Sequence, residues 1–316
     1  MRSALFLGLL GLAGCEHAFE TSDHEYDFPP SAYSAPAPGA TTNVQPKRPA
    51  PGPSYTFDPY AGATGKVAYV EIAASDHYTC GIRSNQQVDC WGDAPANAPS
   101  FLKEISIGPK TACGVDPNGV LHCWGAAEGF EAPIGEELTK VGVGDGFACA
   151  LDPKRHPHCW GPKAIAAPAE ETLEELAVGT DHACGLHADG TAVCWGTGAA
   201  AQPPRAMHFY GLAAGPATTC ALVTGSREAY CWGLLAGAFG GDLERLSVTM
   251  GKACGVRASD DELECWGLSG STDWLRPPAE PLLRVSIGTT HACGLRRGDG
   301  LAICWGSDTS GESRAP

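Results

Sequence analysis

Residues 173–196 read LEELAVGTDHACGLHADGTAVCWG, and this stretch decides the fold. Leu176 and Val178 are spaced as the apolar side of a β-strand is. Cys184 and Cys194 then bracket a turn sequence, and Trp-Gly follows the second cysteine. The same order occurs seven times, and the first cysteine of the pair recurs about every 35 residues, which indicates a repeat protein.

The positions before each first cysteine keep one register along the chain. The residue eight positions before it is always Ile, Val or Leu, and the residue six positions before it is Ala, Ile or Val. Eleven positions before it stand Tyr69, Leu102, Leu138, Leu173, Phe209, Leu243 and Leu282. Because side chains alternate between the two faces of a strand, the spacing predicts a short strand at the start of every repeat.

The two cysteines of a repeat are expected to lie opposite each other in a β-hairpin. If Cys113 faces Cys123, Pro117-Asn118-Gly119 is left as a three-residue loop. The last three repeats have one more residue between the cysteines, which fits a four-residue loop such as Arg297–Gly300. Opposed residues lie about 4.5 to 5.5 Å apart, within disulfide reach. The expected disulfides are Cys80–Cys90, Cys113–Cys123, Cys149–Cys159, Cys184–Cys194, Cys220–Cys231, Cys254–Cys265 and Cys293–Cys304.

Zinc is the alternative for paired cysteines. Structural zinc usually takes cysteines about two to four residues apart, from two segments that converge. Nine or ten residues separate the cysteines of each pair here. A disulfide that closes a loop of this length contributes up to about 2.5 to 3 kcal/mol. We therefore expect disulfides and no metal.

The tryptophan after each second cysteine is expected to pack on the neighbouring repeat. The residue after the first cysteine is always Gly or Ala, and it shares a sheet face with this tryptophan, for which it would leave room. Both faces of every hairpin are then buried, as in sheets that stack radially in a propeller. The alternative is a sugar-binding role. The tryptophans are Trp91, Trp124, Trp160, Trp195, Trp232, Trp266 and Trp305.

These repeats resemble those of the regulator of chromosome condensation family. The pattern Leu-x-x-Val/Leu-x-x-Gly-x-x-x-x-Cys-x-Leu…Gly-x-x-x-Cys-Trp-Gly occurs in residues 173–196 and 282–306, and the resemblance covers about residues 67–311. It implies an all-β, seven-bladed β-propeller of short antiparallel blades. The eukaryotic members have longer repeats without regular cysteines and act on a nuclear GTPase, so that function is not carried over. The shorter repeats are more similar to secreted bacterial members, which include a β-lactamase inhibitor protein.

An export signal precedes the repeats. An apolar or Gly stretch over residues 4–12 follows a positive charge, and it is shorter than the about 20 residues that cross a bilayer. The Leu-Ala-Gly-Cys sequence that ends at Cys15 resembles a bacterial lipobox, whose cysteine is lipidated. We expect residues 1–14 to be a lipoprotein signal peptide and Cys15 the anchor, with an ordinary secretory signal as the alternative. Glu16 in place of Asp favours the outer over the inner membrane.

Residues 15–66 have the composition of a linker. They contain nine prolines and show no apolar periodicity. The prediction is a disordered, Pro-rich tether with a reach of roughly 40 Å, followed by the propeller at residues 67–316. The tyrosines and phenylalanines scattered through the tether leave a binding peptide as an alternative.

Composition excludes some classes of function. A formal net charge of −15 disfavours a nucleic-acid partner, because nucleic-acid affinity comes mainly from Lys and Arg. The zinc-protease, nucleophile-elbow and phosphate-loop motifs do not occur in the sequence. We therefore expect no catalytic residue, metal or cofactor.

Polar side chains recur near the turn before the first cysteine. His182 and His291 stand two residues before it, and His77 stands one position earlier in the first repeat. The other repeats have lost the histidine, so a structural role is favoured over a metal or ligand site. Asp76, with Asp145 and Asp181, could line the central channel or one of its mouths, or could be solvated loop charges. Asp76, His77 and His182 are kept as candidate binding residues.

The segments between Trp-Gly and the next strand differ in length, and loops on a rigid scaffold commonly carry recognition. The longest, residues 268–281, contains Trp274, Leu275 and Arg276. Trp and Arg are preferred interface anchors. Trp274 is therefore predicted either to contact a partner or to brace the neighbouring blade.

The leading functional hypothesis is a non-catalytic protein-binding scaffold, anchored to the membrane of a bacterial envelope or surface and bound to an unidentified protein of that compartment. A lectin that uses exposed aromatic residues is the first alternative, and an enzyme with a site at the propeller mouth is the second. The sequence does not indicate an oligomeric state.

Overall fold

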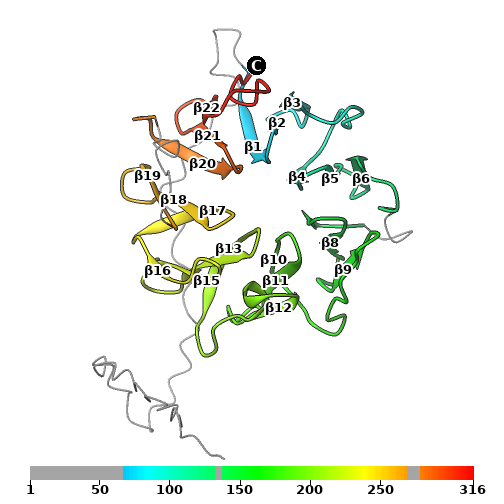
Figure 1. Ribbon diagram of the computed structural model, residues 1–316, viewed down its shortest axis with the longest axis vertical. Helices are drawn as coiled ribbons and strands as arrows, with labels where there is room; N and C mark the ends of the chain where they lie inside the picture. Colours follow the sequence, from blue (N-terminus) through cyan, green and yellow to red (C-terminus); the bar gives the residue numbers. More distant parts are fainter. Residues whose placement is uncertain (1–66, 132–136, 269–277) are drawn as a thin grey trace, which may run out of the picture. The chain divides into compact units, whose positions relative to one another are not determined.

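A computed structural model describes residues 67–131, 137–268 and 278–316. Its strands form seven antiparallel sheets, and each sheet comes from one repeat. Figure 1 shows these sheets as blades around a central axis. The fold is therefore the all-β, seven-bladed propeller that the sequence predicts.

Each blade has an inner, a middle and an outer strand, in the order of the chain. The inner strands are β1 Tyr69–Ala74, β4 Glu104–Ile107, β7 Lys140–Val143, β10 Glu175–Val178, β13 Phe209–Gly215, β17 Leu243–Thr249 and β20 Leu282–Ile287. The middle strands are β2 Tyr78–Arg83, β5 Thr111–Val115, β8 Ala148–Leu151, β11 His182–Leu186, β14 Thr218–Val223, β18 Lys252–Arg257 and β21 His291–Arg296. The outer strands are β3 Val88–Gly92, β6 Leu121–Gly125, β9 Pro157–Trp160, β12 Ala192–Gly196, β15 Ala229–Gly233, β19 Leu263–Gly267 and β22 Ala302–Gly306. Blade 5 adds a fourth strand, β16 Gly237–Phe239.

The cysteines of the middle and outer strands lie opposite each other in every blade. All seven predicted disulfides are present, with Cα–Cα distances of 4.0 to 4.1 Å. The loop lengths are also as predicted. The Asp116 N–H donates to the Val120 carbonyl at 2.9 Å and encloses a three-residue loop, whereas the Arg296 N–H donates to the Leu301 carbonyl at 2.9 Å around a four-residue loop.

A backbone hydrogen bond joins the tip of each hairpin to the next blade. The N–H of the residue eleven positions before the first cysteine donates to a tip carbonyl of the preceding blade at 2.7 to 3.0 Å. The donor and acceptor pairs are Leu102–Gln86, Leu138–Gly119, Leu173–Arg155, Phe209–Gly190, Leu243–Arg227, Leu282–Asp261 and Tyr69–Gly300. Each acceptor residue has a left-handed backbone, with φ between 61° and 86°. The same junction therefore recurs around the ring, including its closure at Tyr69.

The hydrophobic core lies between blades. Cys113 and Val115 of blade 2 pack with Leu138, Val141 and Trp160 of blade 3. The disulfide face of one blade thus packs against the tryptophan face of the next, so both faces of the hairpin are buried as predicted. Blades 7 and 1 pack in the same way.

The small residue after the first cysteine has a different role from the one predicted. A Cβ on Gly114 would lie 2.4 Å from Leu102 Cδ1, and a Cβ on Gly185 would lie 2.4 Å from Leu173 Cδ1. The space is therefore filled by the large residue eleven positions before the cysteine in the same blade, and not by a tryptophan.

The repeat tryptophans pack on the neighbouring repeat. Trp91 donates to the Glu312 carbonyl and Trp232 to the Ala200 carbonyl, both at 2.9 Å. In both cases the acceptor belongs to the segment after Trp-Gly in the preceding blade. Five of the seven tryptophans are at most 8% exposed, which confirms packing over sugar binding for them.

The described ranges contain one short 3-10 helix, Ala199–Ala201, and none of their segments is a long apolar helix of the kind that crosses a membrane. The predicted signal peptide, Cys15 and the tether fall in residues 1–66, outside the described residues.

Candidate functional site

A cavity of about 520 Å³ lies on the axis and is lined by the inner strands of all seven blades. Each inner strand runs from one mouth of this channel to the other. The end of the channel at which the inner strands begin is called the charged mouth. It is lined by Glu71, Glu104, Lys140 and Arg284. We call the other end the loop mouth, where the chain turns from the inner to the middle strand.

The charges of the charged mouth largely neutralise one another. Glu71 pairs with Arg284, and Glu104 pairs with Lys140, both at 3.7 Å. Burial raises the pKa of both glutamates although these cations oppose the shift. The four side chains stand at one register position, nine before the first cysteine, so the pairs join adjacent blades.

Other polar groups of the channel wall also join blades. Ser106 Oγ accepts the Val143 N–H at 3.1 Å, and Ser286 Oγ accepts the Ala74 N–H at 2.9 Å. The Glu175 carboxylate accepts the N–H of Leu212 at 2.8 Å. Each of these side chains accepts a hydrogen bond from a backbone N–H of the inner strand in the following blade. The polar groups of the channel wall therefore hold adjacent blades together. In the described ranges, no three His, Cys, Asp or Glu side chains converge as metal ligands would.

The loop mouth combines two segments from every blade. The residue after Trp-Gly, or in blade 3 the residue after Pro162, donates its N–H to a carbonyl of the inner-to-middle turn in its own blade at 2.7 to 3.0 Å. The donor and acceptor pairs are Asp93–His77, Ala126–Lys110, Lys163–Gly146, Thr197–Asp181, Leu234–Ala217, Leu268–Gly251 and Ser307–Thr290. The backbone of the mouth is thereby held in place, while its side chains differ from blade to blade.

Two of the candidate binding residues lie at this mouth. Asp76 lines the channel there and is partly exposed, and His77 is exposed beside it. Asp145 pairs with Lys163 at 2.5 Å, and Asp181 has an exposed side chain. Of the three aspartates, Asp76 lines the channel, whereas Asp145 and Asp181 are exposed loop charges.

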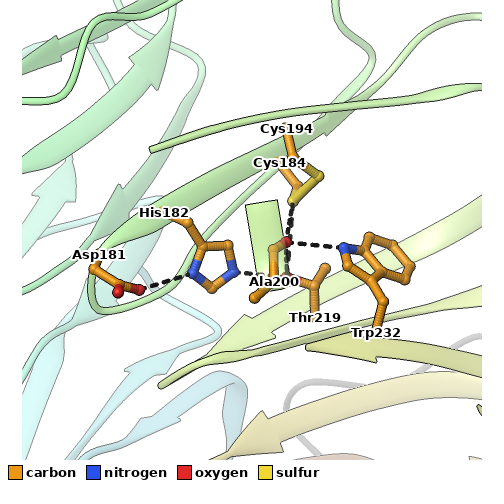
Figure 2. The surroundings of a disulfide bond; sticks show 7 residues. All are labelled: Asp181, His182, Cys184, Cys194, Ala200, Thr219 and Trp232. Carbon is orange, nitrogen blue, oxygen red and sulfur yellow. Dashed lines mark hydrogen bonds and ion pairs between the residues drawn. A yellow bond between two sulfur atoms is a disulfide. The ribbon is translucent and has the colours of Figure 1, made fainter. Parts of the chain in front are cut away.

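The third candidate, His182, is fully buried between blades 4 and 5 (Figure 2). Its Nε2 lies 2.7 Å from Thr219 Oγ1, and its Nδ1 lies 3.3 Å from Asp181 Oδ1. His291 makes the same contact with Thr79 at 2.8 Å, between blades 7 and 1. Burial lowers the pKa of both histidines, so both rings are neutral at pH 7. Both histidines therefore have the structural role that the sequence favours. The His182 ring is buried, so a partner cannot reach it.

Trp274, Leu275 and Arg276 lie outside the described residues, and their role stays a prediction. The sequence analysis did not identify a group of apolar side chains at the loop mouth, Leu234, Leu268 and Met250, which are 45% to 58% exposed. The available signal was the residue after Trp-Gly, which is Leu only in blades 5 and 6.

Comparisons with known proteins agree with this architecture. Residues 174–202 match the model of the regulator of chromosome condensation (RCC1) repeat. The ectodomain of the Physcomitrella patens receptor kinase CR4 is 25% identical with a TM-score of 0.66, over 76% of this chain and 74% of that one. The Arabidopsis thaliana ACR4 ectodomain is 25% identical with a TM-score of 0.65, over 76% and 96%.

Prp20p from Saccharomyces cerevisiae has the same fold at 14% identity and a TM-score of 0.56, over 79% of this chain and 85% of that one. No curated protein sequence matches the chain significantly.

Proposed function

We propose that this chain, a seven-bladed propeller of RCC1-type repeats, is a non-catalytic scaffold that binds a protein at its loop mouth. One observation carries the proposal. The loop mouth is a hydrogen-bonded backbone ring whose side chains vary among the blades, whereas the polar groups of the channel wall are used to join blades. Variable side chains on a rigid frame are the usual basis of protein recognition.

The structural neighbours support a role in binding. Two of them are ectodomains of receptor kinases, and Prp20p binds Gsp1p and histones. These partners belong to those proteins. What transfers to this chain is the use of a propeller frame to hold another protein.

We further propose that the protein is exported and held by lipid on Cys15 in a bacterial envelope, with the outer membrane favoured. Seven disulfides are consistent with an oxidising compartment. The test is labelling of the whole chain with a radioactive fatty acid. We expect label in the wild type and none in Cys15→Ser, whereas globomycin, which blocks cleavage of the signal peptide, should leave the label on an uncleaved precursor. Persistent label in the variant would remove the anchor.

Site-specific photocrosslinking tests the binding proposal. A photoreactive residue in place of His77 at the loop mouth is expected to give a discrete crosslinked protein in cell envelopes. The matched control replaces Val120, an exposed residue on a hairpin loop. Equal crosslinking from both positions would contradict a specific loop-mouth partner.

A lectin remains the second candidate because of Trp274. A glycan array probed with the purified chain separates the two functions. Glycan binding that is lost in Trp274→Ala, without any crosslinked protein, would replace the scaffold proposal. Hydrolytic activity that disappears in Asp76→Asn, at an unchanged melting temperature, would instead indicate an enzyme.

A further inference from the structure

Three exposed large apolar side chains gather in one part of the loop mouth. Leu234, Met250 and Leu268 are 49%, 58% and 45% exposed. The two leucines follow Trp-Gly in blades 5 and 6, and Met250 lies in the inner-to-middle turn of blade 6. We call these three residues the apolar sector. Exposed apolar groups that cluster commonly mark an interaction site.

The two leucines lie close together in space. The N–H of Leu268 donates to the Gly251 carbonyl at 2.9 Å, which fixes the leucine beside that turn. A Cβ on Gly251 would lie 3.0 Å from Leu268 Cδ1 and 3.5 Å from Leu234 Cδ2. Both side chains therefore converge over Gly251, and the apolar sector is one surface across two blades.

No other blade has a leucine, methionine or aromatic residue at the corresponding positions. The residue after Trp-Gly is Asp93 in blade 1 and Thr197 in blade 4, and the position of Met250 is held by Asp76 in blade 1 and Asp145 in blade 3. The fold therefore forms without large apolar side chains at these positions. Their exposure in blades 5 and 6 is not explained by packing.

The remainder of the loop mouth is rich in carboxylates. Among the described residues, no lysine or arginine forms an ion pair with Asp76, Asp93 or Asp181. The lysines of this mouth are Lys110, Lys163 and Lys252, and Lys163 pairs with Asp145 at 2.5 Å. The whole chain carries a formal charge of −15. Charge of this sign favours the approach of a cationic partner.

We infer that the loop mouth recognises a protein segment that carries both a large apolar side chain and lysine or arginine. The apolar side chain lies on Leu234, Met250 and Leu268, and the cations face the carboxylates of Asp76 and Asp93. This inference rests on the proposed scaffold function and specifies the chemistry of its partner.

Synthetic peptides provide the probe. Ten-residue peptides carry a central Leu or Phe and either three lysines or three glutamates, with the other positions identical. The probe is titrated against the full mature chain with its disulfides intact. We expect the basic peptides to bind at least tenfold more tightly than the acidic ones, and this ratio to fall with added salt.

Matched variants locate the binding surface. Leu234→Ser combined with Leu268→Ser is expected to weaken the basic peptides at least tenfold, and Asp76→Asn about threefold. The controls are Val120→Ser and Phe101→Ser, which remove side chains that are 52% and 50% exposed elsewhere. We expect the controls to stay within twofold of the wild type. Unchanged melting temperatures show that all the variants fold.

Several outcomes would overturn the inference. These are equal binding of basic and acidic peptides, no peptide binding, or equal losses in the control variants. Faster hydrogen exchange over residues 269–277 in the double leucine variant, without loss of affinity, would mean that the chain's own segment covers the patch. If the crosslinked partner persists in the double variant, the scaffold function stands and the inference fails. If no partner crosslinks at all, the scaffold function itself fails.

Discussion

The junction of blades 7 and 1 closes the ring, whereas the junction of blades 4 and 5 lies within the continuous chain, and the two use the same contacts. A buried histidine of one blade bonds a threonine of the next, as His291 to Thr79 and His182 to Thr219. A repeat tryptophan donates to a backbone carbonyl in both, at 2.9 Å. In the described ranges each blade is built from its own repeat, and no strand there is exchanged across the closure.

The two junctions differ in how their polar groups are satisfied. His182 Nδ1 faces Asp181, whereas His291 Nδ1 is buried without a described partner. The acceptor of the tryptophan belongs to a connecting segment at one junction and to residues 307–316 at the other, where it is Glu312. Besides the backbone hydrogen bond from Tyr69 to Gly300, ring closure therefore depends on this last segment and on a less completely satisfied histidine, so we expect it to be the more sensitive junction.

The largest effect is expected from removal of residues 307–316. The deletion uncovers Trp91 and removes the acceptor of its indole, so we expect a loss of about 3 to 5 kcal/mol in the free energy of unfolding. Urea unfolding with the disulfides intact measures it. An unchanged midpoint would mean that blade-to-blade packing alone closes the ring.

Sequence analysis predicted the blades well because their defining contacts lie within one repeat. The facing cysteines and the hairpin loops follow from local spacing, and the structure confirms both. The histidine–threonine contacts between blades were missed because they join residues about one repeat apart, as His182 and Thr219 do. A signal was present, since Thr precedes the first cysteine only in the two repeats that follow a histidine repeat around the ring.

The candidate site was predicted less completely. Asp76 and His77 do lie at a channel mouth, but the buried position of His182 depends on the neighbouring blade. The apolar sector required knowing that the residue after Trp-Gly meets the inner-to-middle turn, as Leu268 meets Gly251. That contact is set by the path of the chain, which residue spacing alone does not define.

A second prediction concerns pH at the closing junction. Burial opposes ionisation of Glu312, yet hydrogen bonds from its own N–H, the Ser310 N–H and Ser307 lower its pKa to about 2 from 4.5. A lowered folded-state pKa stabilises the fold above pH 4.5, and this contribution is lost as the pH falls from 4.5 to about 2. We expect up to about 3 kcal/mol from this shift.

Glu312→Gln tests this by abolishing the titration. The difference between wild type and variant in the free energy of unfolding should be largest at pH 7 and shrink steadily below pH 4.5. A difference that does not vary with pH would show that Glu312 stabilises the junction through the packing of its side chain and not through its charge. Asp181→Asn at the junction of blades 4 and 5 serves as the control, because Asp181 is exposed.

A third prediction compares the two threonines. Thr79→Val leaves both ring nitrogens of His291 unsatisfied, whereas Thr219→Val leaves His182 with Asp181. We expect losses of about 2 and about 1 kcal/mol in the free energy of unfolding. Combining Thr79→Val with His291→Phe removes both partners and should recover part of the loss, measured by urea unfolding. Equal losses at the two junctions would contradict the difference in polar satisfaction.

The smallest expected difference concerns the tryptophan hydrogen bonds. Trp91→Phe and Trp232→Phe each remove ring volume and one donor, and Trp124→Phe removes similar volume from a buried indole that has no described acceptor. The Ala200 carbonyl keeps a second donor, Thr219 Oγ1 at 3.5 Å, whereas the Glu312 carbonyl keeps only a contact at 4.0 Å to Cys293 Sγ. We therefore expect Trp91→Phe to cost about 1 kcal/mol more than Trp124→Phe, and Trp232→Phe to lie between them. Urea midpoints of the three variants measure this order. A larger loss in Trp232→Phe than in Trp91→Phe would show that the closing junction is not the more sensitive one.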